Sequence, residues 1–373
     1  MRICLIGGIY GQSGARKDYL QSTPETTLEY GLRGAGHQVT TISHYDAPDF
    51  ARFDIVHVHH LSYGAVRLAS DSSPTPYVFT AHDLSQMNRA PVSVARRLAM
   101  QYVYATADGL VSLSQREAHF QRKAYSISGA RQATIYNGID SRFFKYRRHH
   151  TRGVGRPRQI LFVGQLIPLK RCDLLLRALS GLGREFELSL VYQNSQMEEE
   201  LRALAGTLQI ASRVHFLGKK RPDELAEIYQ RSDLLVLPSS TESLPSVVTE
   251  AMMCGLPFVA SAVGGIPEQA AGFGILLDLL NEHTLRGAIA KMLDGYGAFQ
   301  ADSERISVYA TKTFSIDSMV RQHIALYNEL CGKPPRRKRR WLSPIQAVTR
   351  IALRYSGKTS AHAVDKPALS EKL

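Results

Sequence analysis

The feature of this chain that most restricts its possible folds is a stretch in which two apolar runs flank a short helical pattern. The first run, Asp233–Pro238, predicts a buried strand of a parallel sheet. After a polar turn, a helix is expected to open near Ser246 and to end at Gly255. The second run, Pro257–Ser261, predicts the next strand. A strand–loop–helix–strand unit of this kind predicts an α/β protein.

Two carboxylates lie at the start of this helix. Glu242 falls in the loop before it, and Glu250 falls in its first turns. The first amides of a helix have no partner within the helix, and with the helix dipole they form an anion site. Carboxylates beside such a site accept hydrogen bonds from hydroxyl groups. We therefore expect an anionic, polyhydroxylated ligand, and a sugar nucleotide fits that description.

The same alternation of strands and helices runs through both halves of the chain. With 373 residues the chain is too long for one ordinary core, so two doubly wound parallel-sheet domains are expected. The charged, glycine-containing segment Lys145–Arg158 is expected to link them. We predict a first domain over 1–150, a second over 151–312, a closing helix over 313–332 that packs back on the first domain, and a basic tail over 333–373.

Composition narrows the class of protein further. The N-terminus is a short apolar run followed by glycines, which is typical of a first strand and not of a signal peptide. No apolar stretch approaches the length of a membrane-spanning helix. The four cysteines show no paired spacing, which favours a reduced, cytoplasmic chain.

Four motifs occur in an order typical of one enzyme family. They are Val163–Leu179, Val214–Gly218, Thr241–Pro257 and Gly264–Glu268. In this order they resemble the retaining glycosyltransferases of family 4, whose fold is the GT-B arrangement of two Rossmann-like domains facing across a cleft. The resemblance is strongest over residues 159–268, extends weakly to residues 80–83 and 136–140, and does not cover the tail.

The resemblance implies a role for each matching residue of the second domain. Glu250 would accept hydrogen bonds from the ribose, Glu242 would lie near the donor sugar, and Lys170 would bind the donor diphosphate. Backbone amides at the start of the helix would also meet the diphosphate or sugar, namely those of Ser243, Leu244 and Ser246. The alternative is that both glutamates merely favour a helix N-terminus, an effect of about 0.3–1 kcal/mol.

Two positions depart from the family pattern. Gln165 stands where the family has an arginine, and Arg171 stands where glycine is common. Arg171 would either replace the missing charge or be a solvated surface residue. The main chain around Gly218 would contact the base of the nucleotide.

In the first domain the resemblance places His82 against the donor sugar and Asp83 on the acceptor side. The glycine-rich loop that contains Gly14 would approach the diphosphate, and Arg16 would face an acidic acceptor. The alternative for His82 is a loop histidine bonded only to the backbone. The alternative for the glycine-rich loop is an ordinary loop without a ligand. Gly138 is expected to form a turn with positive φ.

Metal and cofactor sites are not expected. His57 and His59 share one face of a strand, but no nearby carboxylate or cysteine completes a ligand set, so a structural histidine cluster is favoured. We predict a metal-independent enzyme with no cofactor besides a nucleotide-diphosphate-sugar as co-substrate.

The tail carries most of the excess charge. Residues 331–373 hold 11 Lys and Arg against two Asp and Glu, so nine of the 13 net positive charges lie there. Trp341–Tyr355 has the apolar spacing of an amphipathic helix. Contact of residues 333–355 with an anionic membrane surface is favoured over a solvated tail. A nucleic-acid partner is not expected, because no folded reader motif accompanies the charge.

The sequence therefore predicts a retaining hexosyltransferase that moves sugar from a nucleotide-diphosphate-sugar to a hydroxyl acceptor, including a lipid-linked one. Bacterial-type cell-surface polysaccharide or glycolipid synthesis at the inner face of the membrane is the expected setting. A GT-B epimerase or phosphorylase remains an alternative. So does a catalytically silent subunit of a polysaccharide assembly complex, because Gln165 replaces a cationic residue.

Overall fold

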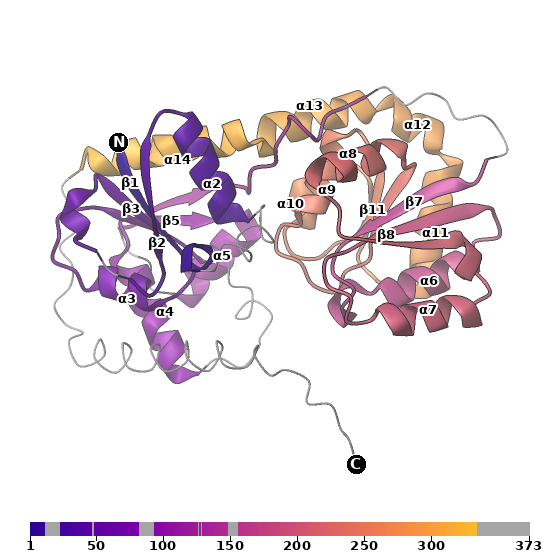
Figure 1. Ribbon diagram of the computed structural model, residues 1–373, viewed down its shortest axis with the longest axis horizontal. Helices are drawn as coiled ribbons and strands as arrows, with labels where there is room; N and C mark the ends of the chain where they lie inside the picture. Colours follow the sequence, from indigo (N-terminus) through magenta and orange to yellow (C-terminus); the bar gives the residue numbers. More distant parts are fainter. Residues whose placement is uncertain are drawn as a thin grey trace, which may run out of the picture. The chain divides into compact units, whose positions relative to one another are not determined.

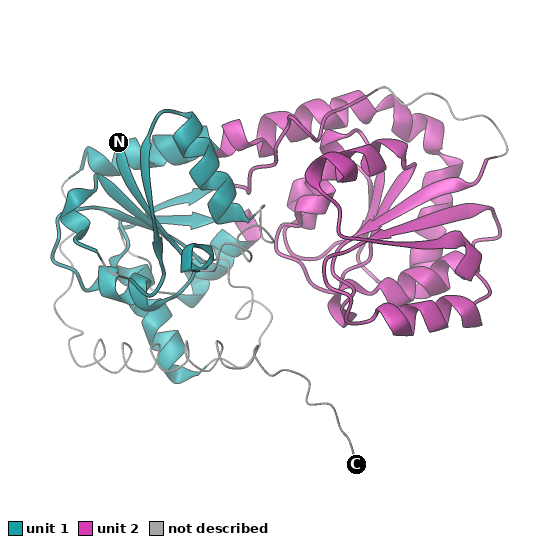
Figure 2. Ribbon diagram, in the orientation of Figure 1, with its two compact units in different colours: residues 1–112, 117–135, 320–373 teal, residues 113–116, 136–319 magenta. Residues whose placement is uncertain are grey.

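A computed structural model describes residues 1–11, 23–46, 48–81, 93–125, 127, 129–147 and 156–333. The chain forms two compact units (Figure 2). The first contains residues 1–112, 117–135 and the chain from 320 onward, and the second contains residues 113–116 and 136–319. The second unit therefore includes a four-residue segment that is flanked on both sides by chain of the first.

The first unit is built on a six-stranded parallel sheet with the order β2-β1-β3-β4-β5-β6. The order reverses between β1 and β3, so the chain runs to one edge and then returns to build the rest of the sheet. The strands are β1 Arg2–Gly7, β2 Gln38–Ser43, β3 Ile55–His59, β4 Tyr77–Thr80, β5 Gly109–Ser112 and β6 Arg131–Thr134.

Helices cover both faces of this sheet, with α2 and α14 on one side and α3 and α4 on the other (Figure 1). Their sequences carry conventional start signals: the side chains of Thr23, Ser62 and Ser93 each accept a hydrogen bond from a first-turn amide. The helices are α2 Pro24–Gly34, α3 Tyr63–Ala69, α4 Val94–Thr106, α5 Gln115–Ala124 and α14 Ile316–Cys331, with 3₁₀ turns at Gly8–Gly11 and Phe50–Arg52.

Helix α14 begins in the second unit, and its residues from Val320 belong to the first. Within the first unit the hydroxyl of Tyr327 lies 2.6 Å from Nδ1 of His57, whose Nε2 lies 2.8 Å from the hydroxyl of Thr80. Arg131 forms a 2.8 Å ion pair with Glu329 near the helix end. Buried polar contacts thus join α14 to β3.

The second unit has its own six-stranded parallel sheet, with the order β12-β11-β10-β7-β8-β9. Here the order reverses between β7 and β10. The strands are β7 Arg158–Val163, β8 Phe186–Val191, β9 Val214–Gly218, β10 Leu234–Leu237, β11 Phe258–Ser261 and β12 Ile275–Leu277. Two doubly wound sheets confirm the predicted fold class.

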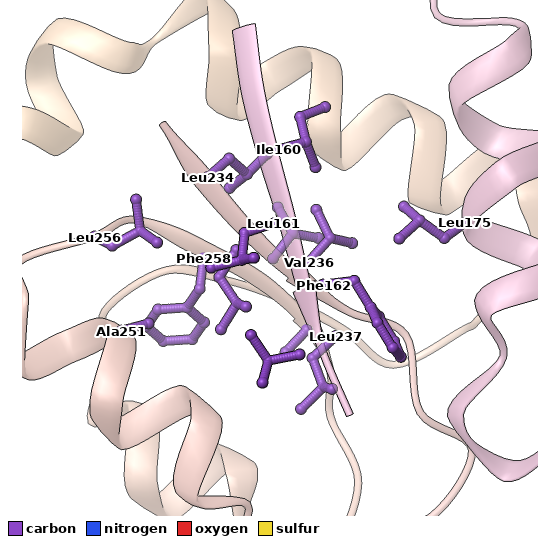
Figure 3. Packing of buried hydrophobic residues seen from close by; sticks show 14 of the residues in the cluster. Ile160, Leu161, Phe162, Leu175, Leu234, Val236, Leu237, Ala251, Leu256 and Phe258 are labelled. Carbon is purple, nitrogen blue, oxygen red and sulfur yellow. The ribbon is translucent and has the colours of Figure 1, made fainter. Parts of the chain in front are cut away.

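The core of this unit consists of apolar side chains from the central strands β7, β10 and β11 and from the helices packed on them (Figure 3). Helices α6, α7 and α11 pack together on one side, and α8, α9, α10 and α13 on the other (Figure 1). Their bounds are α6 Cys172–Ser180, α7 Glu198–Thr207, α8 Pro222–Arg231, α9 Ser246–Met253, α10 Ile266–Ala270, α11 Glu282–Asp294, α12 Tyr296–Ala301 and α13 Ser303–Phe314, with 3₁₀ turns at Pro168–Lys170 and Ala211–Arg213.

The structure corrects the expected role of Gly138. It does not adopt positive φ. A Cβ there would lie only 2.8 Å from the Cα of Ile316, so glycine is needed for close packing against the start of α14. In the described part of the chain, no helix combines the length and the apolar character needed to cross a bilayer.

Candidate functional site

The predicted site residues of the second unit meet where its strand order reverses. Parallel strands β7 and β10 lie side by side, but the loops that leave their carboxyl ends lead to opposite sides of the sheet. In doubly wound sheets ligands bind beside such a reversal point. The two loops here are residues 164–171, after β7, and residues 238–245, after β10.

Backbone and side-chain bonds hold these two loops together. The backbone N–H of Ser240 donates to the carbonyl of Leu169 at 2.8 Å, and its hydroxyl donates to the same oxygen at 3.1 Å. Beside this contact, Nζ of Lys170 donates to Oε1 of Glu242 at 2.6 Å. The side chains are 21% and 8% exposed, so the ion pair is largely shielded from water. The structure thus brings together the two residues expected to contact the phosphate and the sugar.

Helix α9 begins at the predicted residue, Ser246, and ends before Gly255, whose φ of +70° terminates it. Pro245 occupies the N-cap and provides no side-chain cap. Within the described ranges, no hydrogen-bond acceptor is recorded for the amides of Ser243 and Leu244, which precede the helix. The loop and first turn therefore present main-chain donors at a helix N-terminus, where an anion is stabilised.

Glu250 lies one turn further along α9 and has a different partner. The hydroxyl of Tyr229, on α8, lies 2.8 Å from Oε2 of Glu250 and 3.2 Å from the carbonyl oxygen of Val247. Burial raises the pKa of Glu250 to about 7, and the bond from Tyr229 acts in the opposite direction. Tyr229 itself is fully buried. Glu250 is therefore held by a neutral phenol, whereas Glu242 is held by a cation.

Sequence reasoning did not find Tyr229. Its only signal was that a tyrosine on the buried face of an amphipathic helix usually needs a partner for its hydroxyl. Gln269, on α10, was also missed: its amide donates to the carbonyl of Pro245 at 2.9 Å and to the hydroxyl of Thr249 at 2.5 Å. These two residues fix the first turns of α9 from opposite sides.

The Gly264–Glu268 motif supports the same loop from another direction. Gly264 has φ of +59°, and a Cβ there would collide with the carbonyl oxygen of Glu242. The N–H of Gly265 donates to the carbonyl of Ser243 at 2.5 Å. Glu268 accepts from the N–H of Gln115 at 2.8 Å and from the hydroxyl of Tyr136 at 2.6 Å. The glycines are therefore required for close approach of the two loops.

The two positions that depart from the family pattern lie on the β7–α6 loop. Gln165 is exposed. Arg171 adopts a left-handed conformation, with φ of +50°, which explains why glycine is common at this position. Its guanidinium pairs with Asp173, at 3.2 Å from Nε to Oδ1. In this structure the charge of Arg171 is thus directed to its own helix.

Other predicted residues are more distant or fall outside the described ranges. Gly218 has φ of +63°, and its carbonyl accepts a hydrogen bond from the N–H of Tyr192 at 3.2 Å. His82, Asp83, Gly14 and Arg16 lie outside the described residues.

The histidines of β3 share a face, as predicted. The rings of His57 and His59 stack with centroids 4.3 Å apart, and both are buried. Burial lowers the pKa of His59 to about 3. Over the described part of the chain, no three His, Cys, Asp or Glu side chains are arranged to hold a metal ion.

Sequence comparison places the chain in a known family of enzymes. The family model for glycosyl transferases group 1 matches residues 147–313, and that for Glycosyltransferase Family 4 matches residues 46–143. D-inositol 3-phosphate glycosyltransferases are among the relatives. That of Acidothermus cellulolyticus is 30% identical over 303 residues, or 74% of this chain and 67% of the relative. That of Mycobacterium marinum is 32% identical over 317 residues, or 79% and 68%.

Solved structures share the fold. Sucrose-phosphate synthase from Thermosynechococcus elongatus superimposes with a TM-score of 0.73 at 19% identity, covering 89% of this chain and 99% of that one. Anabaena HepE in complex with UDP and glucose gives a TM-score of 0.68 at 20% identity, covering 88% and 100%. The two doubly wound units and their likeness to these structures show a GT-B fold. The chain belongs to the family 4, or group 1, glycosyltransferases, which transfer sugar from nucleotide sugars.

Proposed function

We propose that this protein is a retaining, metal-independent hexosyltransferase whose donor binds at the reversal point of the second unit. The single observation that carries the proposal is the pairing of Lys170 with Glu242 at 2.6 Å, on the loop that leads into the helix of Glu250. A cation, main-chain donors and two carboxylates then lie on two adjacent loops and the first turns of one helix. This set matches a diphosphate flanked by two polyols.

Each group has a distinct task in this proposal. Lys170 and the amides of Ser243, Leu244 and Ser246 bind the diphosphate. The carboxylate of Glu250 accepts hydrogen bonds from the ribose, and that of Glu242 from the donor sugar. HepE, a structural neighbour, has been solved in complex with UDP-glucose, which supports a nucleotide-diphosphate-sugar as the donor. No other cofactor is proposed.

The reaction breaks the bond between the anomeric carbon and the diphosphate oxygen. Negative charge develops on that oxygen, and Lys170 with the helix amides stabilises it. The acceptor hydroxyl forms the new bond on the same face of the sugar, and its proton passes to the departing phosphate. Glu242 and Glu250 do not act as a glycosidase acid and base pair, because a diphosphate leaves without protonation by a carboxylic acid.

The acceptor side is proposed from sequence alone, with His82 near the anomeric carbon and Asp83 and Arg16 toward the acceptor. An acceptor hydroxyl on a lipid-linked or surface glycan fits the basic tail, which lies outside the described part of the chain from residue 334 onward. Each Lys or Arg near an anionic membrane contributes about 1 kcal/mol of binding. Sedimentation with anionic vesicles, with and without residues 333–373, tests this cytoplasmic, peripheral placement. Equal sedimentation of both forms would exclude the tail as the anchor.

A thermal-shift screen of UDP-, GDP- and ADP-sugars identifies the donor, because a bound ligand raises the apparent stability of the fold. With that donor, Glu250→Ala is expected to lower turnover at least 100-fold. The fold should remain intact, because the hydroxyl of Tyr229 keeps the carbonyl of Val247 as a partner. Full turnover by E250A would refute the proposed site. Donor binding by the wild type without turnover on any acceptor would instead indicate a silent binding subunit.

A further inference from the structure

The Lys170–Glu242 pair joins two groups to which the proposed function gives separate ligands. Nζ of Lys170 lies 2.6 Å from Oε1 of Glu242, and Glu242 is the more buried partner. Among the residues described, neither group has another charged partner within ion-pair distance. A diphosphate that binds Lys170 must therefore share the cation with a carboxylate that is already in place.

The backbone around this pair is fixed on both sides. Ser240 is bonded to Leu169 through its N–H and its hydroxyl, which joins the two loops next to the pair. On the other side, the carbonyl of Glu242 packs directly against Gly264, and that of Ser243 accepts from Gly265. The carboxylate of Glu242 can thus leave Lys170 by rotation of its own side chain while both loops stay in place.

The two ligands of a glycosyltransferase site affect this carboxylate differently. A nucleotide sugar brings hydroxyl donors, which a carboxylate can accept after it leaves Lys170. A free nucleoside diphosphate has only its ribose hydroxyls, which the proposed function assigns to Glu250, so it brings no hydroxyl donor to Glu242. Its terminal phosphate also ionises a second time near pH 6, so near neutral pH it places additional negative charge beside Glu242. In a site largely shielded from water this repulsion is poorly screened.

We propose that Glu242 competes with the diphosphate for Lys170, so that the site prefers the nucleotide sugar over the free nucleoside diphosphate. The inference rests on the proposed function and adds a means of discrimination to it. When the sugar has been transferred, Glu242 loses its hydroxyl donors and returns to Lys170, which weakens the hold on the product. Glu242 is then a specificity-determining residue as well as a sugar contact.

The test compares two dissociation constants by isothermal titration calorimetry, using the nucleotide sugar selected in the thermal-shift screen and its free nucleoside diphosphate. In Glu242→Gln the diphosphate is expected to bind at least tenfold more tightly, because Lys170 no longer has an anionic competitor. The nucleotide sugar should bind no more tightly than to the wild type. The preference for the sugar-bearing ligand therefore falls at least tenfold. In Glu242→Asp the carboxylate is withdrawn by one methylene, so the change should be smaller and in the same direction.

Two controls separate this mechanism from a general effect of charge. Glu227→Gln removes the same charge from an exposed pair with Arg231 on α8, and it should leave both constants unchanged. In a Lys170→Gln background, Glu242→Gln should tighten diphosphate binding by a clearly smaller factor, because direct repulsion is still relieved but there is no cation left to compete for.

The outcomes distinguish the inference from the function it rests on. If the wild type binds both ligands but E242Q fails to tighten the diphosphate more than twofold, the inference is wrong and the proposed function stands. A gain that is just as large without Lys170 also overturns it. If the wild type binds neither a nucleotide sugar nor a nucleoside diphosphate, both proposals fail. Should E242Q not fold, as judged by circular dichroism, the same comparison is made with E242D.

Discussion

At the point where the strand order reverses, each of the two sheets has a glutamate paired with a basic residue, but the titratable residues nearby differ in charge. In the second unit Glu242 pairs with Lys170, and in the first Glu25 pairs with His60, at 3.1 Å between Oε1 and Nε2. His60 lies directly after β3 and Glu25 in the first turn of α2. Each pair joins a largely buried glutamate to a basic residue at the carboxyl end of a central strand.

Each unit also has a second titratable residue whose charged form is disfavoured by burial, and the sign of that charge differs between the units. Beside the first pair lies His59, whose pKa burial lowers to about 3. On the helix that follows Glu242 lies Glu250, whose pKa burial raises to about 7. The first unit therefore favours the neutral, deprotonated form of His59, and the second favours the neutral, protonated form of Glu250. The two units should respond to pH in opposite directions.

The largest expected effect is on acid stability, through His59. Unfolded, its imidazole takes up a proton as the pH falls below 6.5, whereas the folded protein resists protonation until about pH 3. Stability is therefore present above pH 6.5 and is lost as the pH falls, by about 3 kcal/mol at pH 4. His59→Phe keeps an aromatic ring beside His57 and removes the titration. Urea unfolding followed by circular dichroism should show a smaller loss between pH 7 and pH 4 in this variant.

Glu25, His60 and His323 also act on the charge of His59, so they stay unchanged in this experiment. The exposed His119, on α5, provides the matched control. His119→Gln should retain the acid sensitivity of the wild type. An H59F variant with the same loss of stability as the wild type would show that other groups control the acid response of the first unit.

The second expected effect has the opposite sign and concerns Glu250. Unfolded, its carboxyl loses a proton near pH 4.5, but in the fold it keeps the proton until about pH 7. Stability therefore decreases as the pH rises between these values and stays low above pH 7. The full difference would exceed 3 kcal/mol, and partial exposure of the residue reduces our expectation to about 2 kcal/mol. Glu250→Gln cannot titrate, so its stability relative to the wild type should be greater at pH 8 than at pH 4.5.

This measurement uses protein without nucleotide, because a ligand would add its own stabilisation. Glu227→Gln, which alters an exposed carboxylate, should show no such trend. A constant difference between E250Q and the wild type across the range would mean that Glu250 is already ionised at low pH, and the contrast between the two units would be lost.

The sequence predicted best those elements whose signal is contained in one apolar run. β10, Leu234–Leu237, lies within the predicted run Asp233–Pro238, and α9 begins at Ser246, near which its start was expected, because a continuous apolar strand and a helix start are local features. β6, Arg131–Thr134, has no such signal. It is an edge strand of polar and small residues, so its sequence carries no apolar run to fix its register.

The sequence predicted which residues form the candidate site but not which side chains they contact. Lys170, Glu242 and Glu250 were identified from motif order, and the structure places all three around the β10–α9 loop. The partner of Glu250 could not be predicted, because Tyr229 contributes to the site only through helix packing. The partner of Arg171 could not be predicted either, because the sequence does not show in which direction a side chain at the end of a loop extends.

The smallest expected effect concerns backbone strain, which the two reversal points share. In the first unit His60, the basic partner of Glu25, adopts a left-handed backbone conformation with φ of +66°. In the second unit Arg171, which follows the basic residue Lys170, does the same with φ of +50°. A non-glycine residue in this conformation is destabilised by about 1–2 kcal/mol. Arg171→Gly relieves this strain but increases the conformational entropy of the unfolded chain. It also removes an exposed ion pair with Asp173, which contributes little to stability. We expect a net gain of about 0.5–1 kcal/mol in the free energy of unfolding.

Arg171→Ala provides the matched comparison, because it removes the guanidinium and keeps the Cβ that causes the strain. R171G should therefore be more stable than R171A, and both should bind the nucleotide sugar as the wild type does if the guanidinium stays with Asp173. A loss of donor affinity in both variants would instead assign Arg171 the charge that Gln165 lacks. Glycine at position 60 should have the opposite effect on stability, because it would leave the buried carboxylate of Glu25 without its 3.1 Å partner. The same backbone strain is thus dispensable beside Lys170 and is offset by the hydrogen bond between His60 and Glu25 in the first unit.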